Sequence, residues 1–243
     1  MKASKGKRKL SVLVIDVGGT HVKILATGQH GERKIDSGPT MTPQKMVRDV
    51  KRLAQGWKYD AVSIGYPGPA VHGRPLREPP NLGRGWVGFQ FSKAFGRPVR
   101  LINDAAMQAL GSYRGGRMLF LGLGTGLGSA MIVDGVTEPM EIAHLPYKKG
   151  RTYEDYIGLG GLQRYGKKKW RRHVADIVEK LKLAMEPDYV VLGGGNSKKL
   201  KKLPAGAELG DNRNAFRGGF RLWENQGPKA SSRLARVRKR KSP

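Results

Sequence analysis

The sequence predicts an α/β protein in which functional residues lie where strands end. Short apolar runs, such as residues 10–15 and 61–65, alternate with segments of helical spacing, as in sheets that are covered by helices. Several of these runs are followed directly by glycines or by Asn-Asp. Open α/β sheets place their reactive groups outside the carboxyl ends of the strands. We therefore expect the functional residues at the strand ends.

Residues 10–23 predict a strand, a tight turn and a returning strand. Residues 10–15 are mostly apolar and β-branched, which suits a strand buried on both faces. Gly18 and Gly19 carry no Cβ and let the backbone come close to a phosphate. Asp16 would then hold a magnesium ion beside phosphate oxygens. An ordinary hairpin with Gly-Gly at its turn is the alternative.

The next segments continue the α/β pattern. A polar strand is predicted at residues 33–37, and a helix begins at Pro43 after Thr42, a good N-cap residue. Gly56 ends that helix, and residues 61–65 form the next strand.

A loop of some twenty residues follows, from residue 67 to residue 88. Loops of this length in compact domains are typically functional or disordered. Trp86 and the phenylalanines after it indicate that the loop is pinned down, which favours function. Residues 83–88 match the G-x-G-x-x-G pattern, but no strand precedes them, so we discount a dinucleotide site.

Asn103 and Asp104 stand at the end of a predicted strand, residues 99–102, and directly before a helix, residues 105–113. This is the position of reactive groups in open α/β sheets. The simpler role for Asp104 is the N-cap of that helix, and position alone favours it.

Two further glycine runs follow predicted strands. Residues 122–128 alternate glycine with leucine and threonine between strands at 118–123 and 129–133. Such a turn forms either a backbone nest facing a phosphate or a glycine-rich hairpin. Three glycines at 193–195 follow a strand at 188–192, which suits a phosphate or a nucleotide.

Helices are predicted at residues 161–185, 196–203 and 212–223. A collar of cations surrounds the start of the first of them: Lys167, Lys168, Lys169, Arg171 and Arg172. Cations at a helix N-terminus oppose its macrodipole, so helix stability does not explain them. Contact with a polyanion would explain this cluster of positive charge.

The net charge is +27, from 46 basic and 19 acidic residues. Residues 1–9 and 226–243 contain no acid and carry +12 of this charge. The rest of the chain therefore carries +15. Such a field attracts nucleic acid, polyphosphate or an anionic membrane surface. A solvated basic surface without a dedicated partner is the alternative for the two ends.

The chain has no cysteine, which excludes disulfides and thiolate metal sites. Glu141 and His144 together are too few ligands for zinc. No apolar run approaches the roughly 20 residues that span a bilayer, and residues 10–15 are too short for a signal core. We expect a cytoplasmic protein without a membrane partner.

Five segments, taken together, resemble the ROK family of sugar kinases in the actin and hexokinase superfamily, and most of all its polyphosphate- or ATP-dependent glucokinase branch. They are IDVGGTHVK (15–23), SIGYPGP with PNLGRGW (63–86), INDAAMQALG (102–111), LGLGTGLGSAMIVDG (121–135) and YVVLGGGNSKK (189–199). The similarity covers about residues 10–223.

The resemblance implies a two-lobed actin-like or ribonuclease H-like ATPase fold with a cleft between the lobes. The first lobe would be residues 10–103 and the second 104–211, with a helix at 212–224 packing back on the first. Residues 1–9 and 226–243 would be basic disordered tails.

The resemblance also implies transfer of a phosphoryl group from polyphosphate, ATP or both to the 6-hydroxyl of glucose. Asp104 would be the general base, and Asp16 would hold Mg²⁺. The implied sugar contacts are Asn81, Asn103, Asp104, Glu141, His144 and Glu154. The implied phosphate or nucleotide contacts are Gly18, Gly19, Thr20, Lys23, Gly124, Thr125, Gly126, Gly193, Gly194 and Gly195.

Departures from the family limit what it implies. Many members carry a cysteine-rich zinc motif, and without cysteine no zinc is implied. Ala143 stands where the family has glycine, which would shift His144 and alter the sugar preferred. Only nine residues precede the first strand, so we do not expect a DNA-binding domain.

Alternatives remain open. One is a kinase that uses only ATP or that prefers another hexose, such as mannose. The other is a polyanion-binding protein without catalysis, which would contact nucleic acid through its basic tails. Relatives of this kind are often homodimers, so a homodimer is expected.

Overall fold

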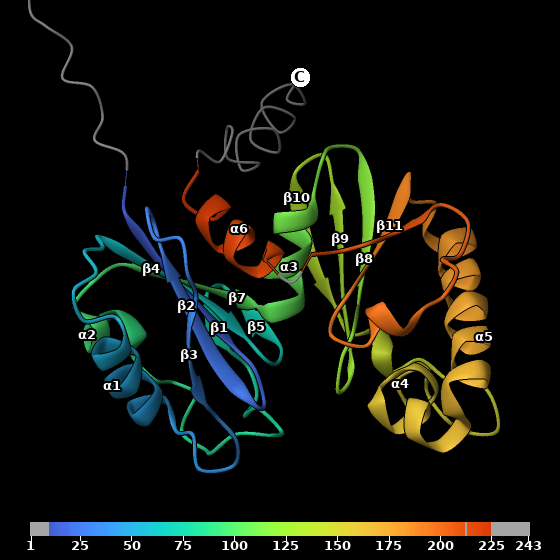
Figure 1. Ribbon diagram of the computed structural model, residues 1–243, viewed down its shortest axis with the longest axis horizontal. Helices are drawn as coiled ribbons and strands as arrows, with labels where there is room; N and C mark the ends of the chain where they lie inside the picture. Colours follow the sequence, from blue (N-terminus) through green and yellow to red (C-terminus); the bar gives the residue numbers. More distant parts are fainter. Residues whose placement is uncertain (1–9, 212, 225–243) are drawn as a thin grey trace, which may run out of the picture.

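The computed structural model describes residues 10–211 and 213–224. They form two five-stranded sheets, a small hairpin and helices around them (Figure 1). The predicted disordered tails, 1–9 and 226–243, lie outside the described residues. Within the described ranges, no helix combines the length and apolar character needed to cross a membrane.

The first sheet has the order β3-β2-β1-β4-β7. β2 is antiparallel to β1, and β4 and β7 continue the sheet in parallel. The strand–turn–strand prediction for residues 10–23 is confirmed. The strands are β1 (Val12–Val17), β2 (His21–Ala26), β3 (Arg33–Asp36), β4 (Ala61–Tyr66) and β7 (Val99–Asn103).

Helices α1 (Pro43–Leu53) and α2 (Phe91–Phe95) cover one face of this sheet. The odd-numbered residues of β1 point into this core, because side chains alternate along a strand. Thr42 caps α1 as predicted, accepting the amide of Lys45 at 3.3 Å.

The loop between β4 and α2 is pinned down, as the aromatic residues indicated. It contains the small hairpin β5 (Ala70–Val71) and β6 (Arg74–Pro75). Trp86 is fully buried. The Glu78 carboxylate accepts the amides of Trp86 and Val87 at 3.0 and 3.1 Å, so an acid within the loop holds its far end.

The second sheet has the order β10-β9-β8-β11-β12. Its strands are β8 (Arg117–Leu123), β9 (Leu127–Val133), β10 (Val136–Met140), β11 (Tyr189–Gly193) and β12 (Ala207–Leu209). Helices α4 (Tyr153–Ile157) and α5 (Leu159–Met185) cover one face through Trp170 and its apolar neighbours. Gly166 interrupts α5 with non-helical backbone angles (φ 69°, ψ 162°).

Helices α3 (Asp104–Ser112) and α6 (Asn214–Arg221) lie between the two sheets (Figure 1). α6 packs Ala215 and Phe216 on the first sheet, and the alanines of α3 pack on the second. A Cβ at Gly218 would overlap the carbonyl oxygen of Met107, so the two helices meet backbone to backbone.

The helix predicted at residues 196–203 is wrong in extent. Only Ser197–Lys199 form a helix, of the 3₁₀ type (η2). The Lys199 amide donates to the Asn196 carbonyl at 2.9 Å, and the Leu200 amide donates to the Ser197 carbonyl at 3.0 Å. These i to i−3 bonds favour a 3₁₀ turn over an α-helix.

Candidate active site

The candidate site forms where strand ends of the first sheet meet the start of α3. Asp16 pairs with Gly65 in the β1–β4 register, and Tyr66 pairs with Asn103 in the β4–β7 register. A Cβ at Gly65 would come within 3.5 Å of the Asp104 Cα. The Asp104 backbone therefore passes over the end of β4, which lies beside Asp16.

Asn103, and not Asp104, is the N-cap of α3. Its Oδ1 accepts the amide of Ala106 at 3.0 Å, and its Nδ2 donates to the Gly68 carbonyl at 3.1 Å. The N-cap interpretation of Asp104 is wrong because Asn103 is the last residue with non-helical backbone (ψ 143°). Both ends of the Asn103 amide hold local structure, and a sugar contact by this residue stays a prediction.

Asp104 is the first residue of α3, and its Oδ1 accepts the neighbouring Ala105 amide at 2.8 Å. Burial, and after it the negative charge of Asp16, raise the pKa of Asp104 from its ordinary value to about 7. The hydrogen bond from the Ala105 amide lowers this pKa, and the charge of Glu141 raises it by a smaller amount. A carboxyl group with a pKa near neutrality is suited to general base catalysis.

Asp16 shares this environment. Burial raises the pKa of Asp16 to about 6, and the nearby Lys23 ammonium lowers it. Asp16 and Lys23 are partners in the β1–β2 register, which places their side chains on the same face. Lys23 also lies 3.7 Å from the Glu32 carboxylate.

Asp104→Asn is expected to stabilise the fold at alkaline pH. The folded-state pKa of about 7 exceeds the ordinary value of 3.8, so the folded protein binds this proton more tightly than the unfolded chain. The penalty for ionising Asp104 thus grows as pH rises between these values and is complete above the folded pKa. Thermal melting should show the variant a few degrees above the wild type at about pH 8, with at least half of the difference lost at about pH 5.

The matched control for that measurement is Asp134→Asn, at an exposed turn. A melting difference for Asp104→Asn that does not change with pH would contradict the assigned environment of Asp104.

The first glycine turn lies against the long loop. The Gly18 amide donates to the His21 carbonyl at 2.9 Å and closes the turn. A Cβ on Gly19 would lie 3.3 Å from the Cβ of Asn81. The structure thus brings together Asn81, a predicted sugar contact, and the predicted phosphate turn formed by Gly18, Gly19 and the exposed Thr20.

The second glycine turn joins β8 and β9 and is held by α4. Glu154 accepts the Leu127 amide at 2.8 Å, and a Cβ at Gly126 would overlap its carboxylate. The Thr125 carbonyl accepts the Leu159 amide at 3.1 Å. The turn is a hairpin as well as a candidate nest, and Glu154, a predicted sugar contact, also supports it.

The third glycine turn crosses the end of β8. Gly194 has a φ of +79°, and a Cβ there would lie 2.5 Å from the Leu123 carbonyl oxygen. Only glycine fits this left-handed position so close to another backbone. Asn196, which sequence reasoning did not single out, donates from Nδ2 to the Gly124 carbonyl at 2.9 Å. The position of Asn196 directly after three glycines is the sequence feature that could have indicated its role.

Glu141 and His144 lie at the two ends of a single 3₁₀ turn, η1 (Ile142–His144). Their side chains approach to 4.0 Å and are 55% and 71% exposed. The Glu141 charge reaches Asp104, whose pKa it raises. Ala143 is buried, so a change at this position acts on the backbone between the two predicted sugar contacts.

The cationic collar lies on α5 after the break at Gly166. Most of its members are exposed. Arg171 is half-buried, and its Nε donates to the Lys199 carbonyl at 2.7 Å. The collar therefore reaches the segment that follows the third glycine turn.

Comparison with known proteins establishes the family. The profile of the ROK family matches residues 12–138. The chain belongs to the ROK family. Polyphosphate glucokinase from Mycobacterium tuberculosis (strain H37Rv) is 29% identical over 210 residues, which cover 77% of this chain and 78% of that protein. A glucokinase from Pyrobaculum calidifontis is 30% identical over 130 residues, 51% of this chain and 44% of that protein.

Solved ROK structures share the fold. An inorganic polyphosphate/ATP-glucomannokinase from Arthrobacter sp. strain KM superposes with a TM-score of 0.74 at 23% identity, covering 87% of this chain and 97% of that chain. A ROK family glucokinase from Streptomyces griseus, in complex with glucose and AMPPNP, gives 0.72 at 17% identity, covering 87% and 98%. The predicted actin-like ATPase fold is confirmed.

Asp16 is the candidate ligand for a metal ion that binds together with the phosphoryl donor. Among the described residues, no three His, Asp or Glu side chains gather into a metal site. Mg²⁺ is commonly held by one or two carboxylates together with substrate phosphates and water. Asp16, whose ionisation is disfavoured by burial, fits such a site because a bound cation would stabilise its charged form.

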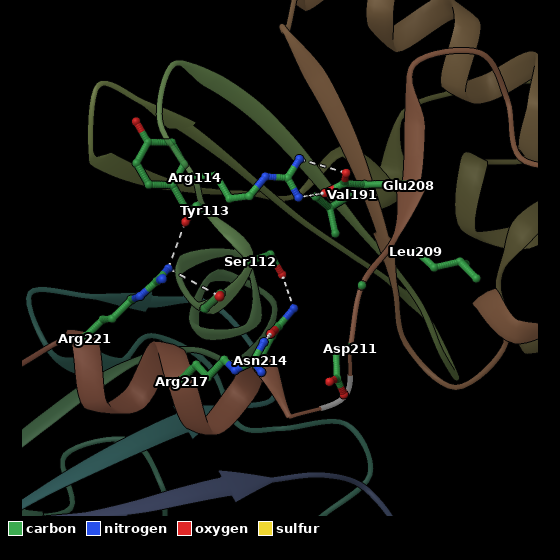
Figure 2. A pocket seen from close by; sticks show the side chains of 12 residues that line it. Ser112, Tyr113, Arg114, Val191, Glu208, Leu209, Asp211, Asn214, Arg217 and Arg221 are labelled. Carbon is green, nitrogen blue, oxygen red and sulfur yellow. Dashed lines mark hydrogen bonds and ion pairs between the residues drawn. The ribbon is translucent and has the colours of Figure 1, made fainter.

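A cavity of about 410 Å³ lies away from this site, at the C-terminal end of α3 (Figure 2). Arg221 donates from Nη1 to the carbonyls of Leu110 and Tyr113 at 2.7 and 2.9 Å, and Arg114 forms a bidentate pair with Glu208 at 2.6 and 2.8 Å. These contacts tie α6 and β12 to the end of α3 opposite Asp104. The cavity is therefore not part of the candidate active site.

Proposed function

We propose that this ROK protein is a sugar kinase that transfers a phosphoryl group from inorganic polyphosphate, ATP or both to the 6-hydroxyl of glucose. The observation that carries the proposal is Asp104, a carboxyl group with a raised pKa beside Asp16 at the meeting point of the strand ends. The polyphosphate glucokinase and glucokinase relatives support the same reaction.

Asp104 acts as the general base in this proposal. It accepts the proton of the sugar hydroxyl as that oxygen attacks the terminal phosphorus of the donor, and the bond from phosphorus to the donor's bridging oxygen breaks. Phosphoryl transfer depends mainly on positioning and on stabilising charge, with one carboxylate orienting the nucleophile. A pKa of about 7 leaves a large deprotonated fraction near neutral pH and keeps proton transfer favourable.

Mg²⁺, when bound with the donor, neutralises charge on the transferred phosphoryl group. Asp16 would hold it, and Lys23 would add a positive charge on the same side of β1. The Gly18 and Gly124 amides close the two glycine turns internally. The amides of Gly19 and Thr20 on one side, and of Thr125 and Gly126 on the other, would bind phosphate oxygens.

The sugar would lie between Asn81, Asp104 and the η1 segment. Glu141 and His144 provide an acceptor and a donor for sugar hydroxyl groups, while Asn103 and Glu154 hold the surrounding backbone. Glucose is the proposed acceptor. Mannose belongs in the test because the Arthrobacter relative is a glucomannokinase.

Polyphosphate is the favoured donor because the chain is strongly basic outside its ends as well as within them. A polyphosphate chain carries about one charge per phosphoryl group, so its binding should fall steeply with salt. The adenosine of ATP, in contrast, would require a stacking or apolar surface near Gly193, Gly194 and Gly195.

Steady-state assays with glucose or mannose, and with ATP or polyphosphate, at two salt concentrations, test the proposal. We expect glucose turnover with polyphosphate, a steeper loss with salt than for ATP, and no turnover when EDTA removes Mg²⁺. Turnover with ATP but none with polyphosphate would contradict polyphosphate as the favoured donor. The absence of phosphorylation of either hexose with either donor would contradict the sugar kinase.

A further inference from the structure

A buried amide connects the second and third glycine turns. Asn196 is 7% exposed. Its backbone amide donates to the Leu123 carbonyl and its Nδ2 donates to the Gly124 carbonyl, both at 2.9 Å. Two bonds from one residue to consecutive carbonyls fix the third turn on the second. Any group that is hydrogen-bonded to the Asn196 side chain is therefore held in place relative to the candidate phosphate turn.

Such a group exists, and it is a cation. The ammonium of Lys199 donates a hydrogen bond to Oδ1 of Asn196, and its backbone amide donates to the Asn196 carbonyl at 2.9 Å. An amide oxygen orients an ammonium group without neutralising its charge, unlike the carboxylates that pair with Lys45 and Lys180. Within residues 10–211 and 213–224 no carboxylate lies within ion-pair distance of Lys199. Its charge is thus available to an anion.

More positive charge continues from this point. Residues 189–207 contain four lysines and no acid. Lys198, Lys201 and Lys202 are exposed. Arg171 bonds to the Lys199 carbonyl at 2.7 Å, and Lys168 lies one turn earlier on the same side of α5. Positive charge therefore extends from the third glycine turn to the collar.

We propose that Lys199, positioned by Asn196, discriminates between donors by binding the part of a polyphosphate chain that lies beyond the transferred phosphoryl group. The lysines after it and the Lys168–Arg171 side of α5 then guide the rest of the polyphosphate along α5. This inference rests on the proposed function. ATP presents an uncharged nucleoside beyond its phosphates, whereas polyphosphate presents further anionic groups, so a fixed cation here favours polyphosphate.

Lys199→Met tests the discrimination. The ratio of KM for polyphosphate to KM for ATP is expected to rise about tenfold, the value of one charge-assisted contact. The logarithmic salt dependence of polyphosphate binding should become shallower by about one unit. Lys199→Arg should recover most of the affinity because it keeps the charge. Lys51→Met, which removes a lysine from the exposed face of α1, is the control for net charge.

Asn196→Ala separates positioning from direct contact. Asn196 holds the Gly124 turn that both donors are proposed to use, so this change should raise KM for ATP as well as for polyphosphate. Unchanged KM values for both donors in Asn196→Ala would contradict its positioning role. Thermal melting identifies variants that have lost the fold.

An equal change for both donors in Lys199→Met, or the same change in Lys51→Met, would overturn the inference. Anisotropy of labelled polyphosphate without sugar distinguishes this failure from failure of the proposed function. If the wild type phosphorylates no sugar but Lys199→Met alone loses polyphosphate binding, the proposed sugar kinase activity is contradicted and the proposed polyphosphate site is supported. If polyphosphate supports turnover and Lys199→Met binds it as the wild type does, only the present inference is wrong.

Discussion

Asp104→Asn is expected to lower kcat for sugar phosphorylation by about 10³-fold, within the range that a positioned general base contributes. Asparagine keeps the size of the side chain, and its oxygen can accept the Ala105 amide, which in the wild type lies 2.8 Å from Oδ1 of Asp104. It takes no proton from the sugar hydroxyl. KM for sugar and donor should change little, because binding does not depend on proton transfer. Steady-state kinetics under saturating donor measure the effect.

The control is again Asp134→Asn, which makes the same chemical change at an exposed turn and should retain full activity. Circular dichroism and melting confirm that Asp104→Asn is folded. A kcat above about one tenth of the wild-type value would contradict the role of Asp104 as the base. A non-catalytic polyanion-binding protein would show no sugar phosphorylation to lose and the same polyphosphate binding in both variants.

Gly218→Ala is expected to have the largest effect on stability, a loss of about 3 kcal/mol and a melting temperature about 6–10 °C lower. Alanine is normally the better helix former by about 1 kcal/mol, so the sign is opposite to helix propensity. The reason is that the new Cβ would overlap the carbonyl oxygen of Met107. Backbone atoms on both sides cannot move aside as a flexible side chain can, and α3 and α6 must separate. Thermal melting and urea unfolding measure the loss.

Gly160→Ala is the matched control. Gly160 lies in the first turn of α5, and nothing lies within 4 Å of a Cβ built there. This variant should melt at or slightly above the wild-type temperature. If Gly218→Ala melted within about 2 °C of the wild type, the close crossing of α3 and α6 would be contradicted.

The helix crossing also links stability to the site. Asp104 begins α3, and Met107, Gly111 and the Leu110 carbonyl that Arg221 binds lie further along the same helix. Changes that separate α6 from α3 would therefore move the start of α3 relative to β1. Gly218→Ala should lower kcat at temperatures where the protein is still folded.

Much of the fold could be predicted because the signals are local. The β1 and β4 strands are continuous apolar runs, and Thr42-Pro43 is a strong helix start. Strand β10 was missed because Pro139 and Glu138 give it an exposed, polar character at the edge of the sheet. Strand β12 was missed because its three residues are paired only by long-range contact with β11.

The candidate site was predictable as a set of strand ends but not in its internal contacts. The sequence placed Asn103 and Asp104 together, yet which of them caps α3 depends on where the backbone turns helical. Glu154 reads as a helix residue, and its bond to the Leu127 amide depends on how α4 packs on the turn. The bond between Asn196 and Gly124 joins residues 72 positions apart, which no local pattern encodes.

The most direct test of the central claim is phosphorus NMR of the wild-type protein incubated with glucose, Mg²⁺ and either polyphosphate or ATP. A signal of glucose 6-phosphate that grows with time at the expense of the donor, and that is nearly absent with Asp104→Asn, is the expected result. Release of inorganic phosphate without any sugar phosphate, or sugar phosphate formed equally by both proteins, would contradict it.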